Sequence, residues 1–329
     1  MTENFPIDIV LPWVDGDDPK HIKHRNMFCT DYGETLREDV GGNSRFQSLG
    51  EIRHCVESIN MFAPFIRKIF IVTDNQDPQL EDHIREKFPH GHIPMEIVDH
   101  RIIFKGFEEY LPVFNSRAIE AMIWRIPELS EHFILMNDDF MFVNHVSPED
   151  FFRNGKTVCY AKRKLILWSK LIGLFRKKSK GHKRISFKES MINAALIMKR
   201  NNSYLYLGHT PRALKKSFYE DFFSQREDVM KRNISFRFRD GRQYNSQELF
   251  YISEDRKGQC LITPFTKKLL YIMPKRGGRY IDRKLAKMDR NKSALFCCIN
   301  TISLAGIDDQ RKILEWVKSK LYQKRQKSE

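Results

Sequence analysis

The chain has 329 residues, of which 41% are hydrophobic and 12% aromatic, and its formal net charge at pH 7 is +15. This apolar content can build a core, so the composition excludes an intrinsically disordered protein. The excess of Lys and Arg predicts anionic partners: nucleic acid, anionic lipid or phosphorylated small molecules. No stretch reaches the roughly 18 apolar residues of a membrane span, and residues 1–8 lack a signal-peptide core. Six cysteines with neither a CxxC motif nor zinc spacing predict reduced thiols in the cytoplasm.

The first half of the chain alternates predicted strands and helices. The strands are expected at residues 7–14, 68–73, 95–98 and 132–136, and the helices at 48–62, 77–88 and 115–126, the last capped by Asn115 or Ser116. Nearly continuous apolar strands separated by helices of this length are typical of a sheet buried on both faces. The pattern therefore predicts an α/β fold with a mainly parallel, Rossmann-like sheet and helices on both faces.

The second half is less regular. An edge strand is expected at 157–164, and helices at 188–198, 211–223, 245–253 and 307–321. We expect residues 1–155 to form an α/β half and 156–329 to form a helical and irregular half that completes one integrated catalytic domain.

Residues 165–184 combine an apolar cluster with a following basic run. Two interpretations remain open for this segment. One is a basic amphipathic surface that touches an anionic bilayer, and the other is a core helix followed by a solvated basic loop.

Two adjacent carboxylates, Asp138 and Asp139, follow the apolar strand at 133–136. In open α/β sheets, ligands bind outside the carboxyl ends of the strands. Mg²⁺ is commonly held there by one or two carboxylates together with substrate phosphates. The triplet from Asn137 to Asp139 thus fits a metal–diphosphate site, and a solvated turn is the competing interpretation.

Four further side chains are candidates. His209 follows a Gly and precedes Pro211, which suits a base aimed into a cleft, although a surface loop histidine has the same pattern. Arg237 and Arg239 alternate, so in an extended segment they would share one face and could clamp a diphosphate, or simply be solvated. Glu120 lies in a predicted helix, where a surface ion pair is the alternative. Neither a GxGxxG nor a GxxxxGK[ST] phosphate loop is present.

Together these motifs resemble the Stealth family of sugar-phosphate transferases. That family includes bacterial capsule and exopolysaccharide hexose-1-phosphate transferases and the catalytic subunit of the lysosomal-enzyme N-acetylglucosamine-1-phosphotransferase. The similar segments are residues 7–19, 50–53, 58–59, 63–73, 111–116, 118–120, 135–139, 208–211, 236–239 and 298–300. Two departures concern the metal or acceptor site. Thr301 follows Asn300 where the family usually has Asp, and residues 240–248 lack a clear match to an Asp that often follows the Phe-Arg motif.

The resemblance implies a GT-A-like fold and transfer of sugar-1-phosphate from a nucleotide-diphosphate sugar, expected to be a UDP-sugar, to a glycan hydroxyl. A nucleoside monophosphate would leave, and a phosphodiester would form. Mg²⁺ or Mn²⁺ would be held by Asp138 and Asp139. The implied catalytic residues are Asp139, His209 and Arg239. The implied substrate-binding residues are Asn115, Ser116, Glu120, Arg53, Arg237, Asn300 and Asp15, with Asp17 beside Asp15 at the exit of the first strand.

The expected partners are a nucleotide sugar and a lipid-linked or polymeric glycan acceptor. The enzyme is expected in the cytoplasm, in peripheral contact with the inner face of the plasma membrane through 165–184. Two alternatives differ in chemistry. A metal-dependent GT-A-type glycosyltransferase would release a nucleoside diphosphate instead. A nucleic-acid-binding protein would explain the charge, but the basic residues are spread along the chain and no nucleic-acid-binding signature is present, so no nucleic-acid partner is expected.

Overall fold

A five-stranded sheet forms the centre of the fold, in the order β3-β2-β1-β4-β9. The computed structural model describes residues 5–29, 50–168 and 186–322. The strands β1, β2, β3 and β4 run parallel, and β9 pairs antiparallel with β4. Their bounds are Ile7–Pro12, Ile66–Thr73, Met95–Asp99, His132–Leu135 and Arg212–Lys215. The predicted mainly parallel α/β sheet is confirmed.

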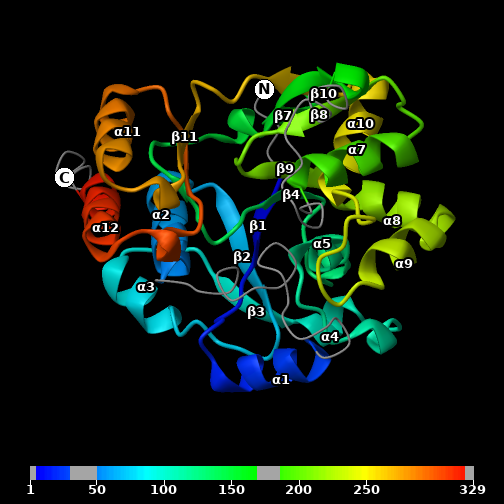
Figure 1. The fold of residues 1–329 in the computed structure, drawn as a ribbon, viewed down its shortest axis with the longest axis horizontal. Helices are drawn as coiled ribbons and strands as arrows, with labels where there is room; N and C mark the ends of the chain where they lie inside the picture. Colours follow the sequence, from blue (N-terminus) through cyan, green and yellow to red (C-terminus); the bar gives the residue numbers. More distant parts are fainter. Residues whose placement is uncertain (1–4, 30–49, 169–185, 323–329) are drawn as a thin grey trace, which may run out of the picture.

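Helices cover both faces of this sheet (Figure 1). One side carries α2, α3, α11 and α12, with bounds Glu51–Phe62, Glu81–Lys87, Gly278–Arg290 and Ile307–Tyr322. The other carries α5, α7, α8, α9 and α10, with bounds Ser116–Glu120, Phe187–Ile197, Lys216–Gln225, Glu227–Ile234 and Ser246–Arg256. The helices α1 and α4 follow β1 and β3, with bounds Pro19–Cys29 and His100–Ile103.

The sequence of β1 explains why the sheet is buried on both faces. Ile9 and Leu11 belong to the hydrophobic cluster on the α2 side, whereas Val10 belongs to the cluster on the α5 side. Alternate residues of a strand point to opposite faces, so every position of an apolar strand finds a core. The one charged residue of β1, Asp8, is buried and accepts two hydrogen bonds from Arg67, at 2.7 and 2.8 Å.

Two smaller sheets flank the central one. The order β11-β12-β5 forms the first, with bounds Leu269–Ile272, Phe296–Ile299 and Phe140–Phe142. The second has the order β10-β7-β6, with β8 also paired to β7, and its bounds are Cys260–Thr263, Lys156–Leu165, Phe152–Arg153 and Ser203–Leu207. Short 3₁₀ helices lie at Glu108–Tyr110, Ile123–Arg125, Pro148–Asp150, Pro274–Arg276 and Ile302–Leu304.

Three predicted elements differ from the structure. The strand expected at the edge, β7, is central, because it pairs with β10, β6 and β8. The helix expected at 211–223 begins as strand β9, since pairing with β4 outweighs the helical spacing of its apolar residues. The helix expected at 115–126 ends at Glu120 and continues as a 3₁₀ turn, and Ile126 before Pro127 is not helical.

Residues 48–49 and 169–184 of two expected elements lie outside the described residues. Within the part of the chain that the structure describes, no helix is both long and apolar enough to cross a bilayer.

Candidate active site

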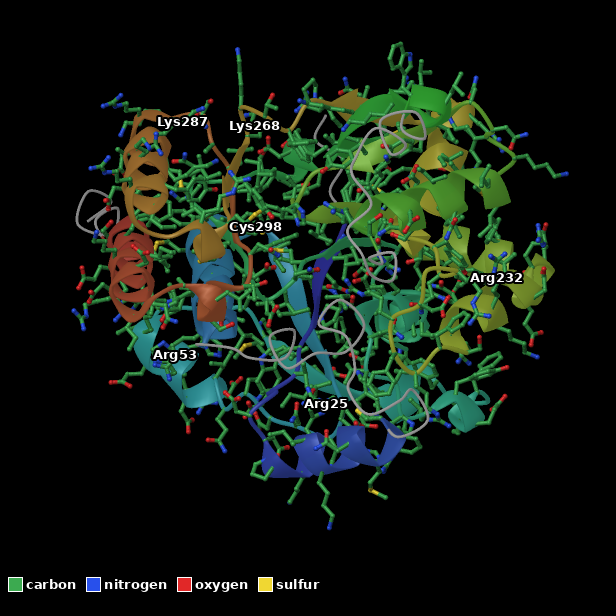
Figure 2. The ribbon with its side chains drawn as sticks, viewed as in Figure 1. Arg25, Arg53, Arg232, Lys268, Lys287 and Cys298 are labelled. Atoms are coloured by element: carbon green, nitrogen blue, oxygen red, sulfur yellow. The ribbon has the colours of Figure 1, made fainter. Side chains whose placement is uncertain are left out.

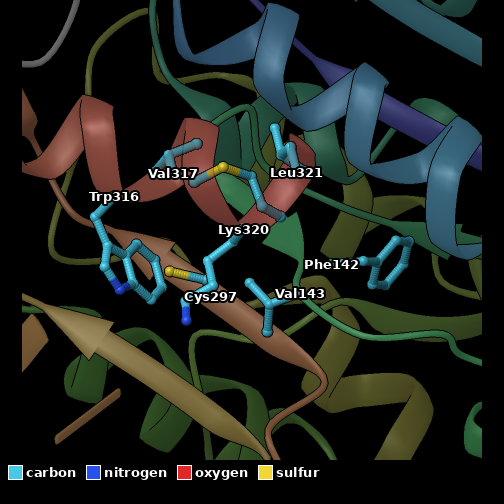
Figure 3. A pocket seen from close by; sticks show the side chains of 8 residues that line it. Phe142, Val143, Cys297, Trp316, Val317, Lys320 and Leu321 are labelled. Carbon is cyan, nitrogen blue, oxygen red and sulfur yellow. The ribbon is translucent and has the colours of Figure 1, made fainter. Parts of the chain in front are cut away.

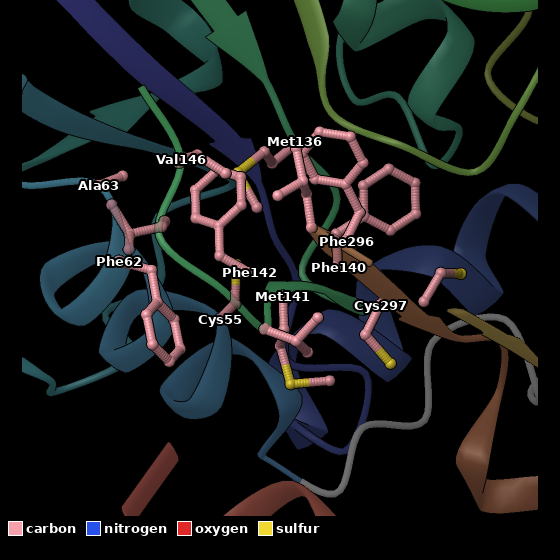
Figure 4. Packing of buried hydrophobic residues seen from close by; sticks show 14 of the residues in the cluster. Cys55, Phe62, Ala63, Met136, Phe140, Met141, Phe142, Val146, Phe296 and Cys297 are labelled. Carbon is pink, nitrogen blue, oxygen red and sulfur yellow. The ribbon is translucent and has the colours of Figure 1, made fainter. Parts of the chain in front are cut away.

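The acidic turn, which we define as Asn137, Asp138 and Asp139, follows the carboxyl end of β4 and leads directly into β5. The residues on both sides of the turn, Met136 and Phe140, are buried and anchor it to the core that Figure 4 shows. Burial raises the pKa values of both aspartates, and the charge of Glu51 at the start of α2 raises both further. The charge of Asp139 also raises the pKa of Asp138. A site that gathers several carboxylates is suited to a bound metal ion.

Strand β12 and the residue after it contact Asp139. The Cys298 thiol lies 3.6 Å from Asp139 Oδ2, and the backbone N–H of Ile299 donates to the Asp139 carbonyl at 3.2 Å. A hydrogen bond from the Asn300 side chain counteracts the rise in the pKa of Asp139. The structure therefore brings the predicted Asn300 to Asp139.

Asp139 Oδ1 is buried and has no hydrogen-bond partner among the described residues. Within residues 5–29, 50–168 and 186–322, no group of three or more His, Cys, Asp and Glu side chains is arranged to hold a metal ion. A metal here would therefore need ligands from the substrate as well as from the two aspartates.

His209 lies just before β9 and stacks on Tyr271, with ring centroids 4.9 Å apart and an interplanar angle of 20°. Burial, together with the charge of Arg212, lowers the pKa of His209 to about 4. The imidazole is neutral at pH 7 and can accept a proton. The preceding Gly208 has a specific role, because a Cβ there would lie 2.6 Å from the ring of Phe265.

Tyr271 connects His209 to the acidic turn. It is registered with Cys298 across β11 and β12. Burial and the charges of Cys298 and Asp139 raise its pKa. Tyr271 therefore stacks on His209 and is close enough to Asp139 to feel its charge, although His209 and Asp139 belong to different halves of the chain.

Arg212 is a buried cation that the sequence did not single out. It is registered with Leu135, two residues before the acidic turn, and donates to the carbonyl and hydroxyl oxygens of Thr210. Burial lowers its pKa, while the charges of nearby groups that include Glu120 and Cys298 raise it. Arg212 thus places positive charge close enough to Glu120 and Cys298 to interact with both.

A second group of predicted residues forms around the start of α5. Arg239 donates to the Ser116 hydroxyl at 3.2 Å. The Asn115 side chain caps α5 by accepting from the backbone N–H of Ala118 at 3.1 Å, and it donates to the carbonyl of Phe236. These contacts make Asn115 a residue that positions Ser116 and Arg239.

Arg237 and Arg239 do not alternate along a strand, because residues 235–240 are irregular. Arg237 donates to the carbonyls of Leu111 and Pro112 at 2.6 and 3.1 Å, so its guanidinium holds two loops together. The side chain of Gln247 donates a hydrogen bond to the Glu120 carboxylate at 2.9 Å. This carboxylate therefore has an amide partner and not the surface cation of the alternative interpretation.

Asp15 and Arg53 have different surroundings. Val14, next to Asp15, packs against Phe114 and Phe238 of this group. The carboxylate of Asp15 accepts from the backbone of Asp17 at 3.0 Å, in a turn that Gln76 ties to β2. Arg53 is exposed on α2, two residues after Glu51, a spacing that turns it away from that carboxylate. Figure 2 shows Arg53 toward the periphery of the molecule and Cys298 nearer its centre.

Buried polar atoms without hydrogen-bond partners gather beyond the carboxyl ends of β1, β2 and β3. In the described part of the chain they are Trp13 Nε1, Thr73 Oγ1 and both ring nitrogens of His100. Buried polar groups are normally paired, so these atoms mark a place where a polar ligand or water is expected. The sequence could not predict these atoms as part of a site, because whether a polar atom has a partner is decided only in the folded chain.

A separate small pocket lies between α12 and the β5–β12 strands (Figure 3). Its lining is apolar apart from Lys320, whose ammonium pairs with Asp289. Cys297 faces this pocket, whereas its neighbour Cys298 faces Asp139. The pocket offers no group suited to a sugar phosphate.

Comparison with known protein families identifies two segments. Residues 5–29 match Stealth protein conserved region 1, and residues 45–160 match Stealth protein conserved region 2. The chain belongs to the Stealth family.

Three curated relatives of this Stealth protein show how far the similarity extends. Capsular polysaccharide phosphotransferase fcs1 of Haemophilus influenzae is 29% identical over 92% of this chain and 80% of its own length. Capsular polysaccharide phosphotransferase cps1A of Actinobacillus pleuropneumoniae is 32% identical over 65% of this chain and 55% of its own. Exopolysaccharide phosphotransferase SCO6021 of Streptomyces coelicolor is 31% identical over 80% of this chain and 46% of its own. The chain thus spans about half the length of the last two relatives.

The fold also resembles a solved structure. The WbbM bifunctional glycosyltransferase in its apo form aligns with 98% of this chain and 52% of its own, with a TM-score of 0.51 and 8% sequence identity. This similarity confirms the GT-A-like fold and carries no information about the reaction.

Proposed function

We propose that this Stealth protein transfers sugar-1-phosphate from a nucleotide-diphosphate sugar, a UDP-sugar in our proposal, to a hydroxyl of a glycan acceptor during surface polysaccharide synthesis. The observation that carries the proposal is that Tyr271 stacks on His209 and also feels the charge of Asp139, which follows the carboxyl end of β4. Curated relatives named capsular and exopolysaccharide phosphotransferases support the same class of reaction.

Asp138 and Asp139 fit a divalent cation, because Asp139 Oδ1 is buried without a partner and both carboxylates have raised pKa values. Mg²⁺ or Mn²⁺ held by these two residues would neutralise charge on the diphosphate. Asn300 and Cys298 would keep the Asp139 carboxylate oriented.

The nucleoside would bind beyond the carboxyl ends of β1–β3, the usual crevice of such sheets. The unpartnered atoms of Trp13, Thr73 and His100 support this placement, since a base or ribose can satisfy them. Asp15 would line this pocket from the exit of β1. Arg53 would reach the substrate only if its exposed side chain changed conformation.

In the reaction, an acceptor hydroxyl oxygen bonds to the phosphorus that carries the donor sugar. The bond from this phosphorus to the bridging oxygen breaks, and the electron pair leaves with the nucleoside monophosphate. His209 accepts the hydroxyl proton, and its pKa rises from its low value when an anionic diphosphate lies nearby. Arg239, oriented by Ser116, would stabilise the equatorial phosphoryl oxygens.

The remaining predicted residues would act around this centre. Glu120 would bind the donor sugar while Gln247 orients its carboxylate. Asn115 and Arg237 would position the loops that carry Ser116 and Arg239.

The acceptor in this proposal is a lipid-linked or polymeric glycan at the cytoplasmic face of the plasma membrane. Three side chains at the end of β7 support membrane contact, since Leu165, Leu167 and Trp168 are 52%, 67% and 62% exposed. We expect the protein to float with anionic vesicles at low salt, and Leu167→Ser with Trp168→Ser to abolish this. A wild-type protein that ignores such vesicles would contradict membrane contact.

Product identification tests the reaction. The protein, Mg²⁺, a panel of nucleotide sugars and a glycan acceptor extract are incubated, and the released nucleotide is followed by ³¹P NMR. We expect a nucleoside monophosphate, lost in Asp139→Asn and His209→Ala and retained in the control His90→Ala, whose side chain is exposed. Release of a nucleoside diphosphate would show a glycosyltransferase reaction and refute the proposal.

A further inference from the structure

Residues 267–292 form one of the strongly basic segments of the chain. Residues 267–292 contain ten Lys or Arg and two Asp, so these 26 residues carry eight of the fifteen net positive charges. The segment comprises β11, a 3₁₀ turn and α11. Such a density exceeds what solubility requires and points to an anionic partner.

Helical spacing gathers the cations of α11 on one side. Arg279, Arg283, Lys287 and Arg290 recur at intervals of four, four and three residues, so they share one face, and all four are exposed. We call this the α11 basic face. Figure 2 shows Lys287, together with Lys268 of the loop before β11, toward one edge of the molecule.

The acidic residues of α11 do not neutralise this face. Asp282 pairs with Lys312 at 3.0 Å, and Asp289 pairs with Lys320 and accepts a hydrogen bond from Trp316 at 2.9 Å. Both carboxylates are therefore occupied by α12. Among the described residues, none of the four cations of the α11 basic face forms an ion pair with a carboxylate.

Neighbouring cations add to the positive charge of the α11 basic face. Arg276 lies over the Tyr280 ring at 5.2 Å, and Lys284 lies over the same ring at 5.8 Å. Burial lowers the pKa of Lys284, and the charges of Lys287 and Arg276 lower it further. Like charges held this close repel each other, so an anion bound here relieves an existing electrostatic cost.

The chain leads from this face to the candidate active site. Strand β11 lies between Lys268 and the turn before α11, and its Tyr271 stacks on His209. Lys268 and Tyr271 are three positions apart, which in an extended chain is roughly 10 Å. A polymer whose end reaches His209 can therefore continue along β11 to α11.

We propose that the α11 basic face binds the growing phosphodiester-linked glycan and holds its end at the active site. This inference rests on the proposed function, because the product of sugar-1-phosphate transfer carries one negative charge at each linkage. A polymer with regularly spaced phosphates matches a row of unpaired cations.

An anionic membrane fits this face less well. The apolar side of α11 is already used, since Ile281 and Met288 are buried in the core, and no large exposed hydrophobic side chain is found in the described residues of 267–292. Helices that lie on membranes insert an apolar side, and α11 has none left to offer.

Charge reversal tests the proposal. Arg283→Glu with Lys287→Glu reverses two exposed cations, and Lys105→Glu with Arg232→Glu makes the same charge change at exposed positions of other elements. Binding of fluorescent poly(glycerol phosphate) is measured by anisotropy at 50 and 300 mM NaCl, with neutral dextran and vesicles containing phosphatidylglycerol as comparisons. We expect salt-sensitive polymer binding that weakens at least tenfold in the α11 variant and less than twofold in the control.

The results distinguish a failure of the polymer-binding proposal from a failure of the proposed function. Unchanged polymer binding in the α11 variant would overturn the proposal, as would a loss of vesicle binding larger than the loss of polymer binding. Release of nucleoside monophosphate with a short neutral acceptor should be the same in both variants and the wild type. If the wild type releases none while polymer binding still needs the α11 basic face, the proposed function fails and the binding surface stands.

Discussion

The clearest test of the fold is the buried carboxylate that joins α2 to α3. Glu57 has a side chain that is 0% exposed, and it contacts His83 at 2.6 Å, Lys87 at 2.8 Å and His54 at 3.4 Å. Its helix also carries Glu51, whose charge acts on the acidic turn. Replacing Glu57 by Gln keeps the shape of the side chain and removes the charge. It therefore measures what the charge contributes to stability and to the position of α2.

The pKa of Glu57 gives the expected magnitude. Burial alone would raise this pKa, but hydrogen bonds from His54, Lys87 and His83 outweigh it and lower the value from 4.5 to about 2. Each pKa unit corresponds to about 1.4 kcal/mol, so the ionised carboxylate contributes roughly 3 kcal/mol to the free energy of unfolding at pH 7. Because the folded pKa lies below the unfolded one, this contribution is complete above pH 4.5 and declines as the pH falls toward 2.

Urea denaturation at a series of pH values checks this expectation. We expect Glu57→Gln to unfold with a free energy roughly 3 kcal/mol lower than the wild type at pH 7, and the difference to shrink between pH 4.5 and 2. Glu86→Gln is the matched control, because Glu86 is exposed on α3, and we expect it to change the free energy by less than about 0.5 kcal/mol. A difference that stays constant with pH, or one below about 1 kcal/mol at pH 7, would refute the reasoning.

Further predictions concern the candidate active site. Gly208→Ala places a Cβ 2.6 Å from the Phe265 ring, so we expect a loss of about 1–3 kcal/mol in urea denaturation and a lower turnover rate because His209 is displaced. The pKa of His209 in the free protein, lowered to about 4, predicts that kcat/KM for nucleoside monophosphate release stays high as the pH falls through 6.5, whereas an unperturbed imidazole would lose activity there. Asn115→Ala removes a helix cap and leaves the Phe236 carbonyl unpaired, so we expect roughly 2–4 kcal/mol lower stability in urea, together with slower turnover because Arg239 loses its support.

The central sheet could be predicted from the sequence because its parallel strands are buried on both faces. Such strands need apolar residues at every position, and this leaves a continuous signal in β1, β2 and β4. β9 left no such signal. Its four residues take their strand conformation from pairing with β4, and that pairing is not encoded in local spacing.

The residues of the candidate site could likewise be predicted only where local sequence positions them. Asp138 and Asp139 were identifiable because a strand and its following turn are local features. Tyr271 and Arg212 were not, since the β11–β12 pairing places Tyr271 beside Cys298 and the β4–β9 pairing places Arg212 beside Leu135. The role of Asn115 in holding the backbone of Phe236 likewise depends on a contact between distant segments.

The acidic turn has a practical consequence because it joins two sheets. β4 belongs to the parallel sheet and β5 to the sheet of β11 and β12. A donor held by Asp138 and Asp139 would stabilise both sheets at once, and ligand at 100 times its Kd adds about 2.7 kcal/mol to the free energy of unfolding. A thermal-shift screen of nucleotide sugars with Mg²⁺ can thus find the donor before any acceptor is in hand.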